Sequence, residues 1–200
     1  MLLGDTDVFP RPFEFQAIQF SWNQVRDFLS QQDLLSWRVR PHRTTLSTKA
    51  HLGFRAITQL DPLDFIVFSA LIRDICEDLE LRRVPITDQV AYSYRCKPSA
   101  DGRLFDREIG YGQFLQRARE VLESDGNISH VAITDIADFY PRIYHHRLEN
   151  ALSAATLKSD HVKAIMGLLK GWNNSETFGI PVGSAPATVL AEATLIDVDQ

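Results

Sequence analysis

The pattern of apolar and polar residues predicts helices along most of the chain, and the clearest of them follows Asp61. Apolar residues recur there every three or four positions, as on one face of a helix. They are Leu63, Ile66, Val67, Ala70, Leu71 and Ile75. Asp61 is a good N-cap, and Pro62 suits the first helical position because its missing N–H would have no partner there. We therefore expect a core helix that begins at Pro62.

The same periodicity predicts further helices. A short amphipathic helix contains Val25, Phe28 and Leu29. Longer helices are expected over residues 112–123, 144–155 and 159–171, the last of them capped by Ser159. The apolar residues of the 112–123 helix are expected to face the core (Phe114, Leu115, Ala118, Val121 and Leu122).

Strict alternation of side chains predicts a strand that starts near Ile128 and includes residues 131–136. One face carries Val131, Ile133 and Asp135, and the other carries Ala132, Thr134 and Ile136. Apolar residues on both faces are typical of a strand buried on both sides, so we expect it to pack between helices. A second alternating run, residues 92–97, predicts another strand in which Tyr92 and Tyr94 share a face. That pair suits either base stacking or cross-strand packing.

Composition limits the classes of protein to which the chain can belong. Two hundred residues, 44% of them hydrophobic and 24% charged, suit a soluble globular chain with one good core. No apolar run is long enough to span a bilayer, and the N-terminus has no signal-like segment. Two cysteines, Cys76 and Cys96, are too few for a disulfide framework or a thiolate metal site. A cytoplasmic protein without a membrane partner is therefore expected.

Charge is distributed unevenly, which changes what the net charge of −5 implies. A negative total argues against a nucleic-acid binder, because such domains are usually basic. Residues 34–60, however, contain no acidic residue and carry several arginines and a lysine (Arg38, Arg40, Arg43, Lys49 and Arg55). This one-signed window predicts a phosphate-facing surface, with an ordinary solvated face as the alternative.

Two carboxylates at the end of the predicted strand are the first candidates for chemistry. Asp135 and Asp138 directly precede an aromatic pair. A carboxylate removed from water must be neutralised, hydrogen-bonded or bound to a metal ion, so the pair predicts a cation site. The alternative is an aspartate that caps a turn or helix before Pro141. The adjacent His145 and His146 have no recognisable ligand spacing, and packing or surface roles are expected for them.

A second stretch, residues 179–195, combines a rigid loop with a helix. Gly179, Pro181 and Gly183 form a loop poor in side chains, and Pro186 lies in the first turn of the helix. Ala187, Ala191 and Thr194 give this helix one face of small residues, which something bulky could approach closely. As structure alone, the stretch would be a Gly/Pro turn and a tightly packed helix.

At these two stretches the sequence resembles the reverse transcriptases. Asp135-Ile-Ala-Asp-Phe-Tyr140 resembles their first palm motif, and Gly179-x-Pro181-x-Gly183 resembles the second. The amino-acid sequences of both motifs are most similar to those of the bacterial reverse transcriptases of abortive-infection and other antiphage defence systems. The resemblance extends back to about Lys49 and so covers roughly three quarters of the chain.

The resemblance implies an α+β fold built as part of a right-hand polymerase. Residues 1–48 would be a leader that packs on the body, 49–127 the fingers, and 128–200 the first part of the palm. The implied activity is RNA-directed DNA polymerisation, in which dNTPs are added to a primer 3′ end on an RNA or DNA template. Two Mg²⁺ ions, with Mn²⁺ as a substitute, would be the cofactors of this nucleotidyl transfer.

Roles in the first palm motif are carried over from the resemblance. Asp135 would be the catalytic metal ligand, and the backbone carbonyl of Ile136 would serve the triphosphate-bound ion. Asp138 is a weaker candidate and is assigned to the substrate. Tyr140 matches the steric-gate position, where an aromatic ring fills the space that a ribose 2′-hydroxyl would need.

Roles elsewhere follow in the same way. Lys49 and Arg55 resemble the pair in the fingers hairpin that holds the triphosphate, although two solvated basic residues are the alternative. Val182 and Gly183 would border the incoming nucleotide. Arg95 and Pro181 would contact the template or primer.

Two departures limit the resemblance. Val182 stands where many reverse transcriptases have Gln, although the defence-associated group commonly has an apolar residue there. No acidic doublet in a hairpin follows Leu195, and no thumb follows either. We therefore expect these residues to be the N-terminal part of a longer polymerase, and we expect this part to be inactive on its own. The alternative is a non-catalytic nucleic-acid-binding or regulatory module on the same scaffold.

Overall fold

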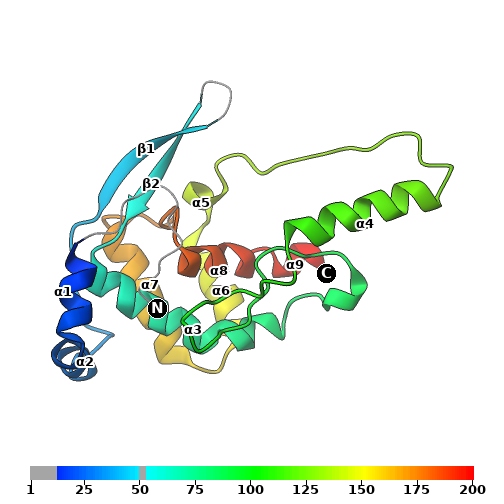
Figure 1. Ribbon diagram of the computed structural model, residues 1–200. Helices are drawn as coiled ribbons and strands as arrows, with labels where there is room; N and C mark the ends of the chain where they lie inside the picture. Colours follow the sequence, from blue (N-terminus) through cyan, green and yellow to red (C-terminus); the bar gives the residue numbers. More distant parts are fainter. Residues whose placement is uncertain (1–12, 50–52) are drawn as a thin grey trace.

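A computed structural model describes residues 13–49 and 53–200 of the chain (Figure 1). Its elements in order are α1 (Glu14–Phe20), α2 (Trp22–Ser30), β1 (Arg43–Lys49), β2 (Gly53–Gln59), α3 (Pro62–Glu80), a 3₁₀ turn (Ile86–Asp88), α4 (Tyr111–Ser124), α5 (Phe139–Arg142), α6 (His145–Ala155), α7 (Ser159–Trp172), α8 (Ala185–Ala193) and α9 (Ile196–Asp199). Helices and a two-stranded sheet make a mixed fold that agrees with the α+β class. No helix in the described ranges is long and apolar enough to cross a membrane.

The predicted core helix is confirmed as α3. It begins at Pro62, and a carboxylate oxygen of Asp61 accepts a hydrogen bond from the backbone N–H of Leu63 at 2.9 Å. The predictions over 112–123, 144–155 and 159–171 are confirmed as α4, α6 and α7. Ser159 is not the cap that the sequence suggested, because it is already the first residue of α7 and Lys158 precedes it without a side-chain cap.

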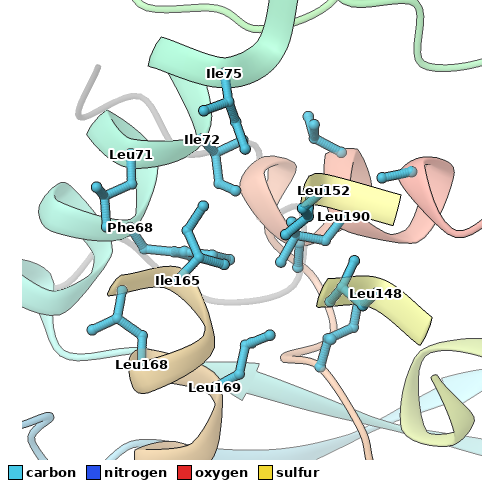
Figure 2. Packing of buried hydrophobic residues seen from close by; sticks show 14 of the residues in the cluster. Phe68, Leu71, Ile72, Ile75, Leu148, Leu152, Ile165, Leu168, Leu169 and Leu190 are labelled. Carbon is cyan, nitrogen blue, oxygen red and sulfur yellow. The ribbon is translucent and has the colours of Figure 1, made fainter. Parts of the chain in front are cut away.

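The core lies where α3, α6, α7 and α8 pack together (Figure 2). Each helix turns its apolar face inward, and the largest side chains there are fully buried. They include Phe68, Ile72, Ile75, Leu148, Leu152, Ile165, Leu169 and Leu190. Phe68 also meets Trp172 edge to face, with ring centroids 5.3 Å apart. These four helices are called the body below.

A polar anchor attaches the segment before the sheet to the body. The carboxylate of Asp64 on α3 is fully buried and accepts hydrogen bonds from Trp37 Nε1 (2.9 Å) and from the backbone N–H of Arg40 (2.7 Å). The Arg40 guanidinium pairs with the same carboxylate at 3.0 Å. Arg40 is therefore held by the protein itself and does not belong to a phosphate-facing surface.

The hairpin of β1 and β2 projects from the body (Figure 1). Its antiparallel register pairs Thr45 with Ile57 and Ser47 with Arg55. Ile57 is buried, whereas Leu46 and Phe54 on the opposite face are about two-thirds exposed. One face of the hairpin therefore packs on the protein, and the other is turned to solvent.

The predicted strand from Ile128 is wrong for this structure. Residues 125–138, all of them described, contain no strand and form an irregular exposed segment. Val131 is 62% exposed and Ile133 is 92% exposed. The physical reason is that a strand needs a neighbouring backbone to satisfy its N–H and C=O groups, and no described segment lies alongside to pair with this one.

Two further sequence-based predictions need correction. The apolar side of α4 was expected to face the core, but α4 contains no buried residue, and Phe114 and Leu122 are more than two-fifths exposed. Residues 92–97 form no strand beyond an isolated bridge between Cys96 and Phe105. Tyr94 has a positive φ of 54°, which breaks the alternation, so Tyr92 is buried while Tyr94 is half exposed.

Candidate functional site

The two motifs that carry the family resemblance lie side by side. The backbone N–H of Gly179 donates to the carbonyl of Ile143 at 2.8 Å, and that of Ile180 donates to the carbonyl of Tyr140 at 3.1 Å. A bridge between Tyr144 and Phe178 continues the contact. The end of the first motif is thus joined through its backbone to the loop of the second.

Two side chains fix the start of this loop, one from α6 and one from the residue that follows α7. The carbonyl of Gly179 lies 2.7 Å from His145 Nε2 and accepts a hydrogen bond from Asn173 Nδ2 at 2.6 Å. Gly179 has φ +91°, a conformation that side-chain-bearing residues rarely adopt. His145 is buried, in agreement with the packing role expected for it. No pattern in the sequence indicated that Asn173 supports the loop.

The hairpin contacts the same loop from the other side. The backbone N–H of Thr58 on β2 donates to the carbonyl of Val182 at 2.9 Å. At Gly183, with φ +99°, a Cβ atom would lie 2.7 Å from Ile57 Cγ2. Glycine is therefore required at this position both by the backbone conformation and by the close approach of β2.

Tyr140 completes the contact between the motifs. Its ring is half buried, and its hydroxyl donates to Thr188 Oγ1 on α8 at 3.0 Å. Burial raises the pKa of this hydroxyl above its usual value, and the nearby Tyr94, Glu192 and Arg55 act on it electrostatically. Tyr140 therefore lies where α5, α8 and the inner face of the hairpin converge.

Arg55 is a basic side chain that remains free near this point. It shares a strand face with Ile57, two residues further on, and that is the face turned toward Gly183. Arg55 is exposed, and its side chain makes no hydrogen bond or ion pair with another described residue. Lys49 ends β1, and its side chain lies outside the described residues. An exposed arginine beside a glycine loop can bind an anion such as a phosphate.

The predicted metal ligands lie in the irregular segment before α5. Asp135 is exposed and forms no hydrogen bond or ion pair within residues 13–49 and 53–200. Asp138 has φ +52°, and one of its carboxylate oxygens lies 4.0 Å from Arg142 Nη2 at the surface. The expectation that Asp135 is removed from water is therefore wrong for this structure. The carboxylates of Asp135 and Asp138 and the carbonyl of Ile136 are hard oxygen ligands of the kind that Mg²⁺ prefers. In the described part of the chain, however, no group of three or more His, Cys, Asp or Glu side chains is arranged to hold a metal ion.

The two residues predicted to contact nucleic acid are buried. Arg95 is 6% exposed, and its guanidinium pairs with Glu80 at 2.6 Å and donates to the carbonyl of Val84 at 2.9 Å. Pro181 is buried within the loop. Neither residue offers an exposed surface to a template, so the structure gives both of them supporting roles.

A buried ion pair lies beside Arg95. Arg83 Nη2 meets a carboxylate oxygen of Glu192 on α8 at 2.7 Å, and Arg83 Nη1 donates to the carbonyl of Tyr94 at 2.9 Å. Burial raises the pKa of Glu192 to about 7, and the charge of Arg83 opposes this shift. The pair connects α8 to the loop that carries Tyr94.

The small-residue face of α8 packs against the protein rather than against a ligand. Ala187 and Ala191 are almost completely buried, and α8 packs on α3 and α6. This is the alternative that the sequence left open, a tightly packed helix. The polar residues Ser184, Thr188 and Glu192 follow one another at intervals of four and so share another face. Their spacing in a mostly apolar helix was a signal that the sequence-based predictions missed.

Comparisons of the chain with protein family models, with curated proteins and with solved structures found no match. The resemblance to reverse transcriptases therefore rests on the residues of the two motifs. The activity that follows from it is a proposal.

Proposed function

We propose that this chain carries the fingers and the first part of the palm of a bacterial RNA-directed DNA polymerase that acts in the cytoplasm in antiphage defence. The observation that supports the proposal best is the convergence of three sequence-predicted parts. The hairpin with Arg55, the loop with Val182 and Gly183, and the ring of Tyr140 come together through the hydrogen bonds described above. These parts are far apart in sequence, and a dNTP site needs all three.

Each part has a role that its chemistry suits. Arg55 would grip the triphosphate of the incoming dNTP, since a guanidinium can bind two phosphate oxygens at once. Lys49 would add a second positive charge. The side-chain-poor surface at Gly183 would let the nucleotide approach the backbone closely. Tyr140 would occupy the space beside the sugar and so favour deoxynucleotides.

Metal ions would be held by the segment that precedes Tyr140 in the chain. Asp135 and the carbonyl of Ile136 would hold Mg²⁺, with Mn²⁺ as a substitute, and further acidic ligands would be needed. When bound, the metal would lower the pKa of the primer hydroxyl and offset the charge that develops on pyrophosphate. The exposure of Asp135 leaves its carboxylate accessible to an ion.

The experiment is an incorporation assay on the complete encoded protein, including any residues that the gene specifies after Gln200. It uses labelled dNTPs, a template-primer and Mg²⁺ or Mn²⁺. Asp135→Ala is expected to abolish incorporation, because a metal ligand is lost. Glu123→Ala, an exposed acid at the end of α4, is the matched control and should leave the rate unchanged. Equal incorporation by wild type and Asp135→Ala would remove Asp135 from the chemistry.

A second candidate function is a non-catalytic nucleic-acid-binding module. It is favoured by Arg38, Arg43 and Arg55, which are exposed and make no ion pair with another described residue. Template-primer binding without dNTP incorporation by the complete protein would support this candidate over the polymerase.

A further inference from the structure

Tyr140 is held both at its main chain and at its hydroxyl by the loop and helix of the second motif. At the backbone, its carbonyl accepts a hydrogen bond from Ile180 N–H at 3.1 Å. At the far end, its hydroxyl donates to Thr188 Oγ1 at 3.0 Å. The first bond fixes the main chain of Tyr140 and the second fixes the position of its hydroxyl, so together they restrict rotation of the side chain about χ1.

The acceptor at the far end is itself oriented. The hydroxyl of Thr188 donates to the carbonyl of Ser184 at 3.2 Å, one helical turn earlier. Its proton is used there, so its lone pairs are available to the hydroxyl of Tyr140. The three groups form a directed chain from Tyr140 through Thr188 to Ser184.

The helix that carries this acceptor is packed into the core. Leu190 and Ala187 of α8 are fully buried, and Thr188 lies between them on the face turned toward Tyr140. A contact made from such an element holds its partner more accurately than a contact made from a mobile loop.

We infer that Thr188 is a positioning residue that fixes the Tyr140 ring and thereby sets how strongly the protein rejects ribonucleotides. The inference rests on the proposed function, because it assumes that the ring lies beside the sugar of the incoming nucleotide. Without the bond to Thr188, rotation about χ1 would move the ring away from a 2′-hydroxyl. With that bond in place, the same rotation has to break it. A large side chain at position 140 is then necessary for the rejection of ribonucleotides, but it is not sufficient unless Thr188 holds it in place.

The experiment compares four single variants of the complete encoded protein and one double variant, which combines Thr188→Val with Tyr140→Phe. Thr188→Val keeps the shape of the side chain and removes the hydroxyl, Thr188→Ser keeps the hydroxyl, and Tyr140→Phe keeps the ring and removes its donor. The measurement is kcat/KM for a dNTP divided by kcat/KM for the matching rNTP. Thermal unfolding of each variant is measured alongside.

Thr188→Val is expected to lower this ratio about 5-fold, the effect of losing one neutral hydrogen bond. Tyr140→Phe should lower it by a similar factor, and the double variant should lower it no further, because both remove the same bond. Thr188→Ser should retain a ratio within about twofold of wild type. The change should arise mainly from improved use of the rNTP.

The outcomes separate this inference from the proposed function. Tyr140→Ala is included as a reference that removes the ring itself. If it changes the ratio while Thr188→Val does not, the ring discriminates without help from Thr188 and the inference is overturned. Equal loss of activity on both nucleotides in Thr188→Val would show a structural role and would also overturn it. Absence of incorporation by wild type would overturn the proposed function and the inference together.

Discussion

The body and the segment that extends from it have the same kind of sequence pattern, regularly spaced apolar residues, but they differ in whether those residues are buried. We call residues 111–138 the arm, because α4 and the chain after it extend away from the body (Figure 1). Both regions have regularly spaced apolar residues. In the body these residues are buried between helices, whereas in the arm Phe114, Leu122 and Ile133 remain exposed.

The difference comes from what each pattern needs in order to be satisfied. A helix forms its interior backbone hydrogen bonds within itself, so α4 exists although its apolar face is only partly covered, with the Tyr92 ring 6.1 Å from that of Phe114. A strand has no internal hydrogen bonds, so the alternation in residues 131–136 produces no ladder without a partner. Apolar periodicity thus predicts helices independently of their surroundings but predicts strands only together with their neighbours.

The largest test of this comparison is a truncation of a buried aromatic residue. Phe68→Ala in the body is expected to lower the free energy of unfolding by about 3–5 kcal/mol, because it removes a fully buried ring and leaves a cavity. Urea unfolding followed by circular dichroism measures the change. Phe114→Ala in the arm is the matched control, and we expect it to cost less than about 1 kcal/mol, because the Phe114 ring is 46% exposed. Equal losses would mean that the arm packs as tightly as the body.

Local patterns account for what was predictable from the sequence. The bounds of α3 follow from Asp61, Pro62 and the apolar stripe, which all lie within one segment. The resemblance of the two motifs assigned Tyr140 and Gly183 to the same incoming nucleotide, which implies that they lie close together. In both cases the signal is contained in a short run of residues.

Long-range polar contacts account for what could not be predicted. The bond from Tyr140 to Thr188 joins residues 48 positions apart, and that between Arg83 and Glu192 joins residues 109 apart. Such contacts depend on how the helices pack, and many polar residues could have been partners. The burial of Arg95 is a further example, because an arginine in an alternating run resembles a surface residue until its partner Glu80 is known.

The body and the arm are also expected to differ in how their acidic residues make stability depend on pH. Burial raises the pKa of Glu192 from 4.5 to about 7 in the folded protein. The folded state then retains a proton that the unfolded state releases between these values, so the stability due to protonated Glu192 is present below pH 4.5 and is lost as pH rises to 7. At about 1.4 kcal/mol per pH unit, the complete loss is about 3 kcal/mol.

Glu192→Gln is therefore expected to flatten the pH dependence of stability. Urea unfolding at pH 5 and pH 8 should show that wild type loses about 2–3 kcal/mol more than the variant over this interval. Arg83 faces the carboxylate directly, and Glu80, Arg95 and Asp199 also act on it, so the difference between wild type and variant is the informative quantity. Glu123→Gln in the arm should match wild type. Parallel pH profiles for wild type and Glu192→Gln would contradict the raised pKa.

The smallest expected effect concerns the most exposed apolar residue of the arm. Ile133 is 92% exposed, so Ile133→Lys should change the free energy of unfolding of residues 1–200 by less than about 0.5 kcal/mol. The same urea assay measures this change. Ile165→Lys in the body is the contrasting variant, and it should prevent folding because it would bury an unpaired charge. A cost of several kcal/mol at Ile133 would mean that this side chain is packed in solution. Residues 131–136 would then form a strand that pairs with another strand in solution. The arm would differ from the body because that second strand is absent from the structure, and not because its sequence pattern is different.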